Sequence, residues 1–105
     1  MKTELAVDML SALAYAARLD IFRYLVRIGP DGAPAGDIAS ACNITPSTLS
    51  HHLNQMRQCG LIGRTRQGRA QIYHVNFDAM NTLIGFLSDD CCNGQPDLCL
   101  KGNEK

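Results

Sequence analysis

The clearest periodic stretch lies in the middle of the chain, where Leu49, Leu53 and Met56 recur at i, i+4 and i+7. This spacing gives a helix one continuous apolar face. Pro46 suits the first position of such a helix, because its missing N–H would be unsatisfied there anyway. Gly60 stands where a glycine commonly ends a helix. The pattern therefore predicts one helix between the proline and the glycine.

Beyond this helix the pattern becomes that of two short strands. Residues 62–66 and 70–75 are predicted to be extended, and Gln67-Gly68-Arg69 between them is predicted to form the turn. Strands joined by so short a connection pair as an antiparallel hairpin. The middle of the chain is thus expected to be a helix followed by a hairpin.

Four other segments have the apolar spacing of helices, and residues 29–34, rich in glycine and proline, interrupt them. Ile28 and Ala41 are among the side chains expected to face the interior. The predicted helices are Thr3 to about Ala14, about Ala17 to Ile28, Ala35 to Cys42, and about Phe77 to Asp90, the last capped by Asn76.

The order of these elements indicates a fold class. Two short helices separated by a tight turn, the second rich in small polar groups, are the layout of a helix-turn-helix. The hairpin that follows would be its wing. We therefore predict a mainly α, winged helix-turn-helix protein with the order ααααββα. Residues 1–90 would form one DNA-binding and dimerisation domain, and residues 91–105 a cysteine-containing tail.

The last predicted helix is unusually apolar for so small a domain, and it needs a surface to lie against. Together with the first helix it is the candidate interface of a homodimer. The alternative is that both helices close the core of the single chain. The expected interface residues are Leu5, Met9, Met80, Leu83, Ile84 and Leu87.

Charge is distributed unevenly along a chain with ten residues of each sign. Residues 43–76 contain four arginines and neither aspartate nor glutamate, so a local basic surface coincides with the helix and hairpin. We predict that this surface binds double-stranded operator DNA; the alternative is a solvated basic face on a protein-interaction module. The expected DNA-binding residues are Pro46, Ser47, Thr48, Ser50, His51, Asn54, Arg57, Arg64, Arg66 and Arg69.

Two adjacent histidines on the central helix are expected to have different environments, because consecutive side chains point in different directions. His51 shares the polar face with Ser47 and Asn54. His52 lies nearer the apolar face, where a partly buried imidazole with a hydrogen-bond partner is expected. The arginines of the hairpin are expected to contact phosphate or the minor groove, which contributes affinity more than sequence choice.

Other features narrow the cellular setting and the function. No signal peptide and no run of membrane-spanning length is recognised, so we expect a cytoplasmic protein that contacts no membrane and keeps its five cysteines as thiols. No nucleophile is paired with an oriented base, and no glycine-rich phosphate loop is present. An enzyme is therefore not expected.

Several separated motifs resemble one family. Residues 11–22, the Ser47-Thr48-Leu49-Ser50-His51-His52-Leu53 segment, and the following Cys59-Gly60-Leu61-Ile62 with a wing ending in Ile72-Tyr73 are similar to the ArsR/SmtB winged-helix repressors. The resemblance covers roughly residues 5–90. It implies a homodimer that occupies an operator until an inducer binds, with the first and last helices forming the dimer contact.

The sensing sites of that family match only in part. Residues 32–37, where many members carry a Cys-x-Cys pair, contain no cysteine, and residues 77–90, where zinc sensors have histidine, contain none. The tail instead has Cys91, Cys92 and Cys99, and so resembles the arsenite-responsive members with C-terminal thiols. Three thiolates suit pyramidal As(III) or Sb(III), since soft ligands select soft metalloids. The resemblance thus implies As(III) or Sb(III) as the inducer.

Three alternatives to a metalloid site stay open at the level of sequence. The tail thiols could form a redox or persulfide sensor, or bind another soft metal, or the tail could be idle. Cys42 and Cys59, on either side of the central helix, are expected to pack as small hydrophobes.

Overall fold

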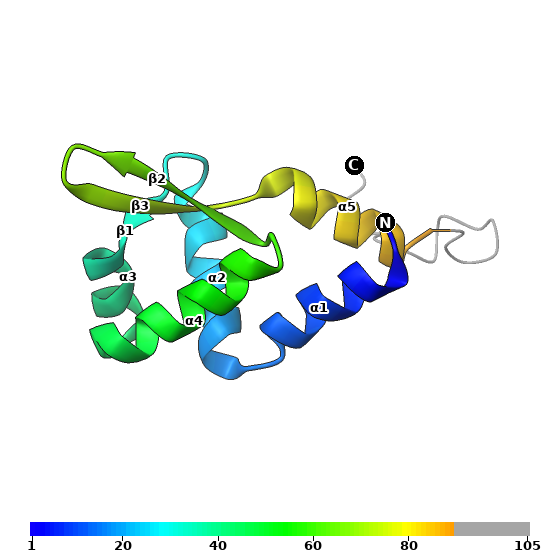
Figure 1. The fold of residues 1–105 in the computed structure, drawn as a ribbon, viewed down its shortest axis with the longest axis horizontal. Helices are drawn as coiled ribbons and strands as arrows, with labels where there is room; N and C mark the ends of the chain where they lie inside the picture. Colours follow the sequence, from blue (N-terminus) through cyan, green and yellow to red (C-terminus); the bar gives the residue numbers. More distant parts are fainter. Residues whose placement is uncertain (90–105) are drawn as a thin grey trace.

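A computed structural model describes residues 1–89, and these residues form the predicted winged helix-turn-helix (Figure 1). Each of the five predicted helices and both strands of the hairpin are present within that range. The elements in chain order are α1 (Thr3–Leu13), α2 (Ala16–Ile28), β1 (Ala33–Pro34), α3 (Ala35–Cys42), α4 (Pro46–Gln58), β2 (Ile62–Gln67), β3 (Ala70–Val75) and α5 (Phe77–Leu87).

The wing is an antiparallel hairpin whose register runs from the Ile62–Val75 pair to the Gln67–Ala70 pair. Its turn is shorter than predicted, because Gln67 belongs to β2 and only two residues connect the strands. Gly68, the first of these, has a φ of 62°. A glycine with positive φ at this position is typical of a type II′ turn, whose twist matches that of the strands.

A third strand, β1, was not predicted. Ala33 and Pro34 pair antiparallel with β3, opposite Tyr73 and Ile72, which gives the sheet the order β1-β3-β2. The sequence predicted a break here because the strand has only two residues and one is proline. Proline is compatible with this place, since β1 lies at the edge of the sheet. The strand connects the base of the wing to the start of α3.

The core lies where α2, α3, α4 and the base of the sheet meet. Two predictions about it were wrong: Ile28 is 42% exposed at the last position of α2, and Ala41 is exposed in the last turn of α3. Helix ends leave the packed layer, so the periodic pattern overestimates burial there. The largest fully buried side chains are Ile21, Leu25, Ile38, Leu49, Leu53, Met56 and Leu61.

The C-terminus of α4 is set by a glycine, as predicted. Gly60 has a φ of 85°, its N–H donates to the carbonyl of Arg57, and the N–H of Leu61 donates to that of Met56. These two bonds are the Schellman pattern, which satisfies carbonyls that the end of a helix leaves free. The exit direction of the chain from α4, and with it the start of the wing, is thereby determined.

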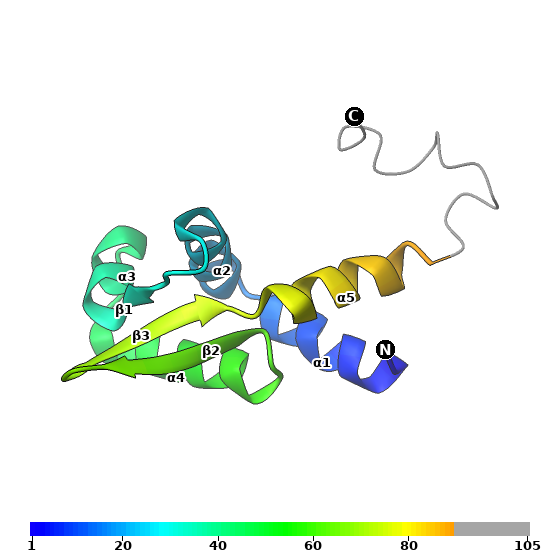
Figure 2. The same cartoon turned by 90° about the horizontal axis from the view of Figure 1, so that it is seen from above.

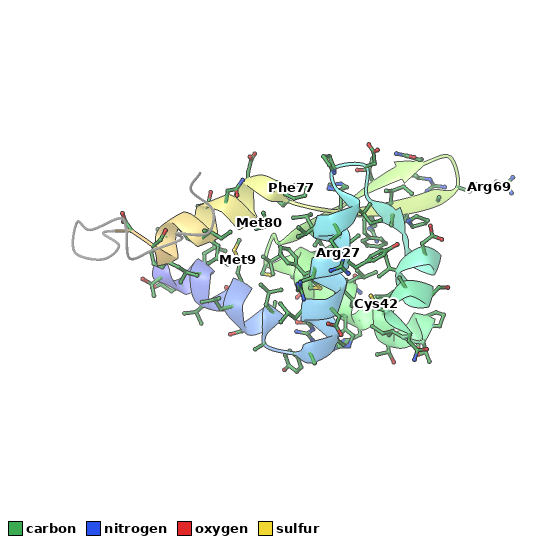
Figure 3. All side chains as sticks on the ribbon, turned by 180° about the vertical axis from the view of Figure 1, so that it is seen from behind. Met9, Arg27, Cys42, Arg69, Phe77 and Met80 are labelled. Atoms are coloured by element: carbon green, nitrogen blue, oxygen red, sulfur yellow. The ribbon has the colours of Figure 1, made fainter. Side chains whose placement is uncertain are left out.

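Helices α1 and α5 lie side by side at the end of the molecule opposite the tip of the wing (Figures 1 and 2). The structure corrects two of the six residues expected at a dimer interface: Met9 is 3% exposed and Leu83 is 5% exposed within the single chain. Met80 packs against the same core, and Figure 3 labels it beside Met9. Leu5, Ile84 and Leu87 are exposed.

Candidate nucleic-acid interface

Helix α4 has one buried and one exposed face. Leu49, Leu53 and Met56 are at most 1% exposed, which fixes the rotation of the helix about its axis. The predicted DNA-binding residues of the other face are accordingly exposed. These are Pro46, Ser47, Thr48, Ser50, His51 and Asn54.

The first turn of α4 follows α3 closely. Asn43, with a φ of 56°, ends α3 in the left-handed conformation, and α4 begins three residues later. Thr45 occupies the N-cap position, but its hydroxyl donates to Thr48 Oγ1 at 3.0 Å instead of accepting from the backbone. The backbone N–H groups of the first turn therefore have no side-chain cap, and such groups bind phosphate readily.

The predicted arginines of the wing are all exposed. Arg64 and Arg66 alternate along β2 and so lie on one face of the hairpin. Arg66 donates through Nε to the carbonyl of Gly68 at 3.1 Å, which holds its guanidinium beside the turn. Arg69 occupies the turn itself, at the tip of the wing (Figure 3). The positive charge of the wing therefore projects beyond the body of the molecule.

Arg57 lies in the last turn of α4 and is half-buried. Its Nη1 donates to Asn54 Oδ1 at 3.3 Å, a contact between residues three apart on the helix. This bond connects the end of the polar face to the side chains near its middle. Residues 43–76 contain no carboxylate side chain to compete for these arginines.

The predicted environment of His52 is confirmed. The imidazole is half-buried, and its Nδ1 accepts a hydrogen bond from Arg18 Nε at 3.0 Å. Burial, then the positive charge of Arg18, then His51, lowers the pKa of His52 below its ordinary value. Arg18 itself is only 6% exposed, and its guanidinium lies 4.1 Å from the centroid of the Tyr15 ring.

Arg18 is a residue that sequence reasoning missed. It lies in the first turn of α2, and its side chain is buried there. The signal that could have found it is the absence of an apolar residue at a position that the helical spacing directs inward. An arginine there must find an acceptor, because a buried cation without one is costly.

The two described cysteines, Cys42 and Cys59, are half-buried, in agreement with the prediction that they pack as small side chains. Burial is the main cause that raises the pKa of both thiols. The Cys59 thiol donates to the carbonyl of Met56 at 3.4 Å. Because the thiolate is the reactive and metal-binding form, the raised pKa disfavours that form at both residues.

The predicted inducer ligands Cys91, Cys92 and Cys99 lie outside the described residues. Within residues 1–89 no three histidine, cysteine, aspartate or glutamate side chains gather in a group that could hold a metal ion. In the same part of the chain, no helix is long and apolar enough to cross a membrane.

The chain is similar to known regulators of transcription. Residues 13–63 match a family model described as a helix-turn-helix domain. The HTH-type transcriptional regulator YgaV from Escherichia coli (strain K12) is 32% identical over 89 residues, which are 85% of this chain and 88% of YgaV. The transcriptional repressor SdpR from Bacillus subtilis (strain 168) is 34% identical over 64 residues, 61% of this chain and 71% of SdpR.

A solved structure extends the similarity to the whole fold. The homodimeric winged helix-turn-helix DNA-binding domain of Mb0332 from Mycobacterium bovis, a possible ArsR-family transcriptional regulator, superposes with a TM-score of 0.67. The match covers 83% of this chain and 81% of that one, at 24% identity. The sequence relatives are regulators and not enzymes, as predicted. The chain therefore belongs to the DNA-binding helix-turn-helix transcriptional regulators, and its winged-helix fold is the ArsR-like one.

Proposed function

We propose that the protein is a homodimeric repressor that occupies operator DNA and releases it when As(III) or Sb(III) binds Cys91, Cys92 and Cys99. The observation that carries the DNA-binding part is the shared exposure of the polar face of α4 and the arginines of the wing. Both belong to one unit without carboxylates. A helix of this kind fits the major groove, while the wing meets phosphates beside it.

The exposed face of α4 would contact the DNA bases. The first turn of α4 and the wing would contact the phosphates of the DNA backbone. Ser50, His51 and Asn54 are short or planar polar side chains that can hydrogen-bond to base edges. The uncapped first turn and the wing arginines would bind phosphates. A neutral imidazole at His51 is a poorer guanine ligand than a guanidinium, so this surface would draw its affinity mainly from the backbone contacts.

A second copy of the chain is the proposed occupant of the exposed surface of α1 and α5. Leu5, Leu10, Ile84 and Leu87 are between 41% and 59% exposed in the single chain. Large apolar side chains grouped in this way are typical of an interaction surface. Mb0332 is homodimeric with a related fold. Two copies joined here would present two α4 helices to successive major grooves.

The inducer site is proposed from the chemistry of the tail. Adjacent Cys91 and Cys92 supply two sulfurs, and Cys99, beyond Gly94 and Pro96, supplies the third. Three thiolates complete the pyramid of As(III), and zinc would require a fourth ligand. The raised pKa of Cys42 and Cys59 argues against either of them as a replacement ligand.

The proposal is tested with DNA from the region upstream of the protein's own gene. A fluorescently labelled duplex should be bound in preference to a scrambled duplex, and arsenite should release it at a constant salt concentration. Release by oxidants or persulfide, with none by arsenite or antimonite, would replace the metalloid with a redox signal. Equal, weak binding of both duplexes would contradict operator binding itself.

A further inference from the structure

A pair of side chains connects the start of α2 to the middle of α4, and its histidine lies between the buried face of α4 and the exposed DNA-binding residues. Arg18 Nε donates to His52 Nδ1 at 3.0 Å, and the guanidinium stacks over Tyr15 at 4.1 Å. Arg18 is 94% buried, so its position is set by packing. Nothing in the proposed function assigns a role to either residue.

The hydrogen bond requires a neutral imidazole. Nδ1 accepts from the guanidinium, so it must carry a lone pair, and the ring proton of neutral His52 is on Nε2. Adding a second proton would remove the acceptor and place two positive charges about one hydrogen-bond length apart. Within residues 1–89 Arg18 forms no ion pair with a carboxylate, so direct pairing would not offset this repulsion.

The groups around His52 do not stabilise its protonated form. Arg18 from α2 and His51 from α4 are the charged or titratable groups that act on the imidazole, and both disfavour its protonation. The ring centroids of the two histidines are 5.9 Å apart. Asp8 of α1 and Arg18 line the same surface hollow of about 440 Å³. The negative charge of Asp8 contributes there to the raised pKa of the Cys59 thiol.

We propose that Arg18 is a positioning residue for operator binding, which holds the orientation of α4 through neutral His52, so that protonation of His52 releases the helix and weakens binding. This proposal rests on the proposed DNA-binding function and adds a residue and a condition to it. Neither residue needs to contact DNA. They act by fixing the side of α4 that presents Ser50, His51 and Asn54.

The sign of the predicted pH effect separates it from ordinary electrostatics. A histidine that gains charge near phosphate would tighten binding as the pH falls. Here the protonated protein must lose a proton from His52 before the Arg18–His52 bond can form. Affinity should therefore fall as the pH drops below the pKa of His52 in the free protein, which burial, Arg18 and His51 place below the ordinary histidine value. The depressed pKa of His52 places the loss in the acid range and leaves binding at pH 7.5 intact.

The experiment measures the dissociation constant for operator duplex between pH 5.5 and pH 7.5 at fixed ionic strength. Each pH unit below the His52 pKa of the free protein should weaken binding by up to about tenfold, because the DNA-bound form does not take up the proton. The affinity of the parent should therefore fall measurably as the pH approaches 5.5. His52→Asn should bind like the parent at pH 7.5 and lose the acid effect, because the Asn Oδ1 takes the place of Nδ1 and does not titrate. His51→Asn is the control for the neighbouring histidine: it removes a proposed DNA contact, so its affinity should be lower at every pH, but the acid effect should remain.

A second variant tests the arginine. Arg18→Lys keeps the charge but lacks the planar Nε donor, so its affinity at pH 7.5 should fall while the melting temperature stays within a few degrees of the parent. Acid weakening that survives in His52→Asn, or parent affinity that only rises as the pH falls, would overturn the inference. Failure of the parent to prefer operator duplex at pH 7.5 would instead overturn the proposed function.

Discussion

At the scale of single residues, one backbone position beside the sheet tolerates only glycine. Gly32 has a φ of 72°, and a Cβ there would collide with the carbonyl oxygen of Tyr73. Gly36, four residues later, is helical and has open space where a Cβ would stand. Two glycines close in sequence therefore have opposite structural roles.

We expect Gly32→Ala to destabilise the protein and Gly36→Ala to stabilise it. The positive φ alone costs about 1–3 kcal/mol for a residue with a Cβ, and the contact with Tyr73 adds to it. In α3, alanine in place of glycine should gain about 0.5–1 kcal/mol. Urea unfolding followed by circular dichroism measures both changes, and equal midpoints for the two variants would contradict the structure around β1.

At the scale of elements, the wing supplies charge while α4 supplies polar side chains, and the two contributions can be separated by salt. Each phosphate contact contributes a slope of about −0.9 to the plot of log K against log salt concentration. Arg64 and Arg66 are exposed on the same face of β2, so both are placed to contact phosphate from one wing.

The double variant Arg64→Ala/Arg66→Ala should bind operator with a slope flatter by about 1.8 per protomer. Binding is measured by fluorescence anisotropy from about 50 to 300 mM salt. Arg23→Ala/Arg27→Ala, which removes two exposed arginines from α2, is the matched control and should keep the parental slope. A parental slope in the wing variant would show that these arginines do not meet phosphate.

The sequence predicted helices α4 and α5 well, because residues within or next to each helix determine its apolar face and its ends. The apolar face of α4 and its terminal Gly60 predicted a helix that packing and two backbone bonds confirm. Asn76 was predicted to cap α5, and its Oδ1 accepts from the N–H of Ala79 at 3.1 Å. Strand β1 could not be predicted, because two residues have no periodicity and their pairing with β3 is made only in the folded chain.

The sequence predicted the exposed side chains of the candidate site but not the contacts between distant elements. Exposure of the polar face of α4 follows from its periodicity, but the Arg18–His52 bond joins residues 34 apart in sequence. The same limit explains the error at Met9 and Leu83: a periodic pattern shows which face of a helix is apolar, and not whether the same chain or another covers it. Here Met9 of α1 and Leu83 of α5 are already buried within the single chain.

At the scale of the whole molecule, two candidate surfaces lie at opposite ends. The tip of the wing marks one end, and helices α1 and α5, which carry exposed apolar side chains, lie at the other (Figure 2). A dimer formed through α1 and α5 would leave both DNA-binding surfaces free. Its geometry would determine the spacing of the two α4 helices, and thus the spacing of the operator half-sites.

We expect Ile84→Asp to give a folded monomer that no longer binds operator tightly. Ile84 is 43% exposed, so the single chain tolerates the change, whereas an aspartate in a dimer interface would be a buried, unpaired charge costing about 3–5 kcal/mol. Sedimentation velocity measures the mass. Asn81→Asp adds the same charge to α5 without removing an apolar side chain and should remain dimeric. A dimeric Ile84→Asp would place the interface elsewhere.

In the proposed function, a metalloid bound by three tail thiolates removes the repressor from DNA. For this to occur, As(III) must bind the DNA-free form more tightly than the bound form, since equal affinities would release nothing. The coupling would pass through α5, which precedes the tail and forms part of the proposed dimer surface.

The most direct test is arsenite-driven release of operator duplex, measured for the parent and for each of the five single Cys→Ser variants. Cys91→Ser, Cys92→Ser and Cys99→Ser should bind the duplex like the parent and fail to release it, because each loses one of three sulfur ligands. Cys42→Ser and Cys59→Ser should release it like the parent. A responsive Cys99→Ser beside an unresponsive Cys42→Ser or Cys59→Ser would contradict the account and place the sensor beside α4.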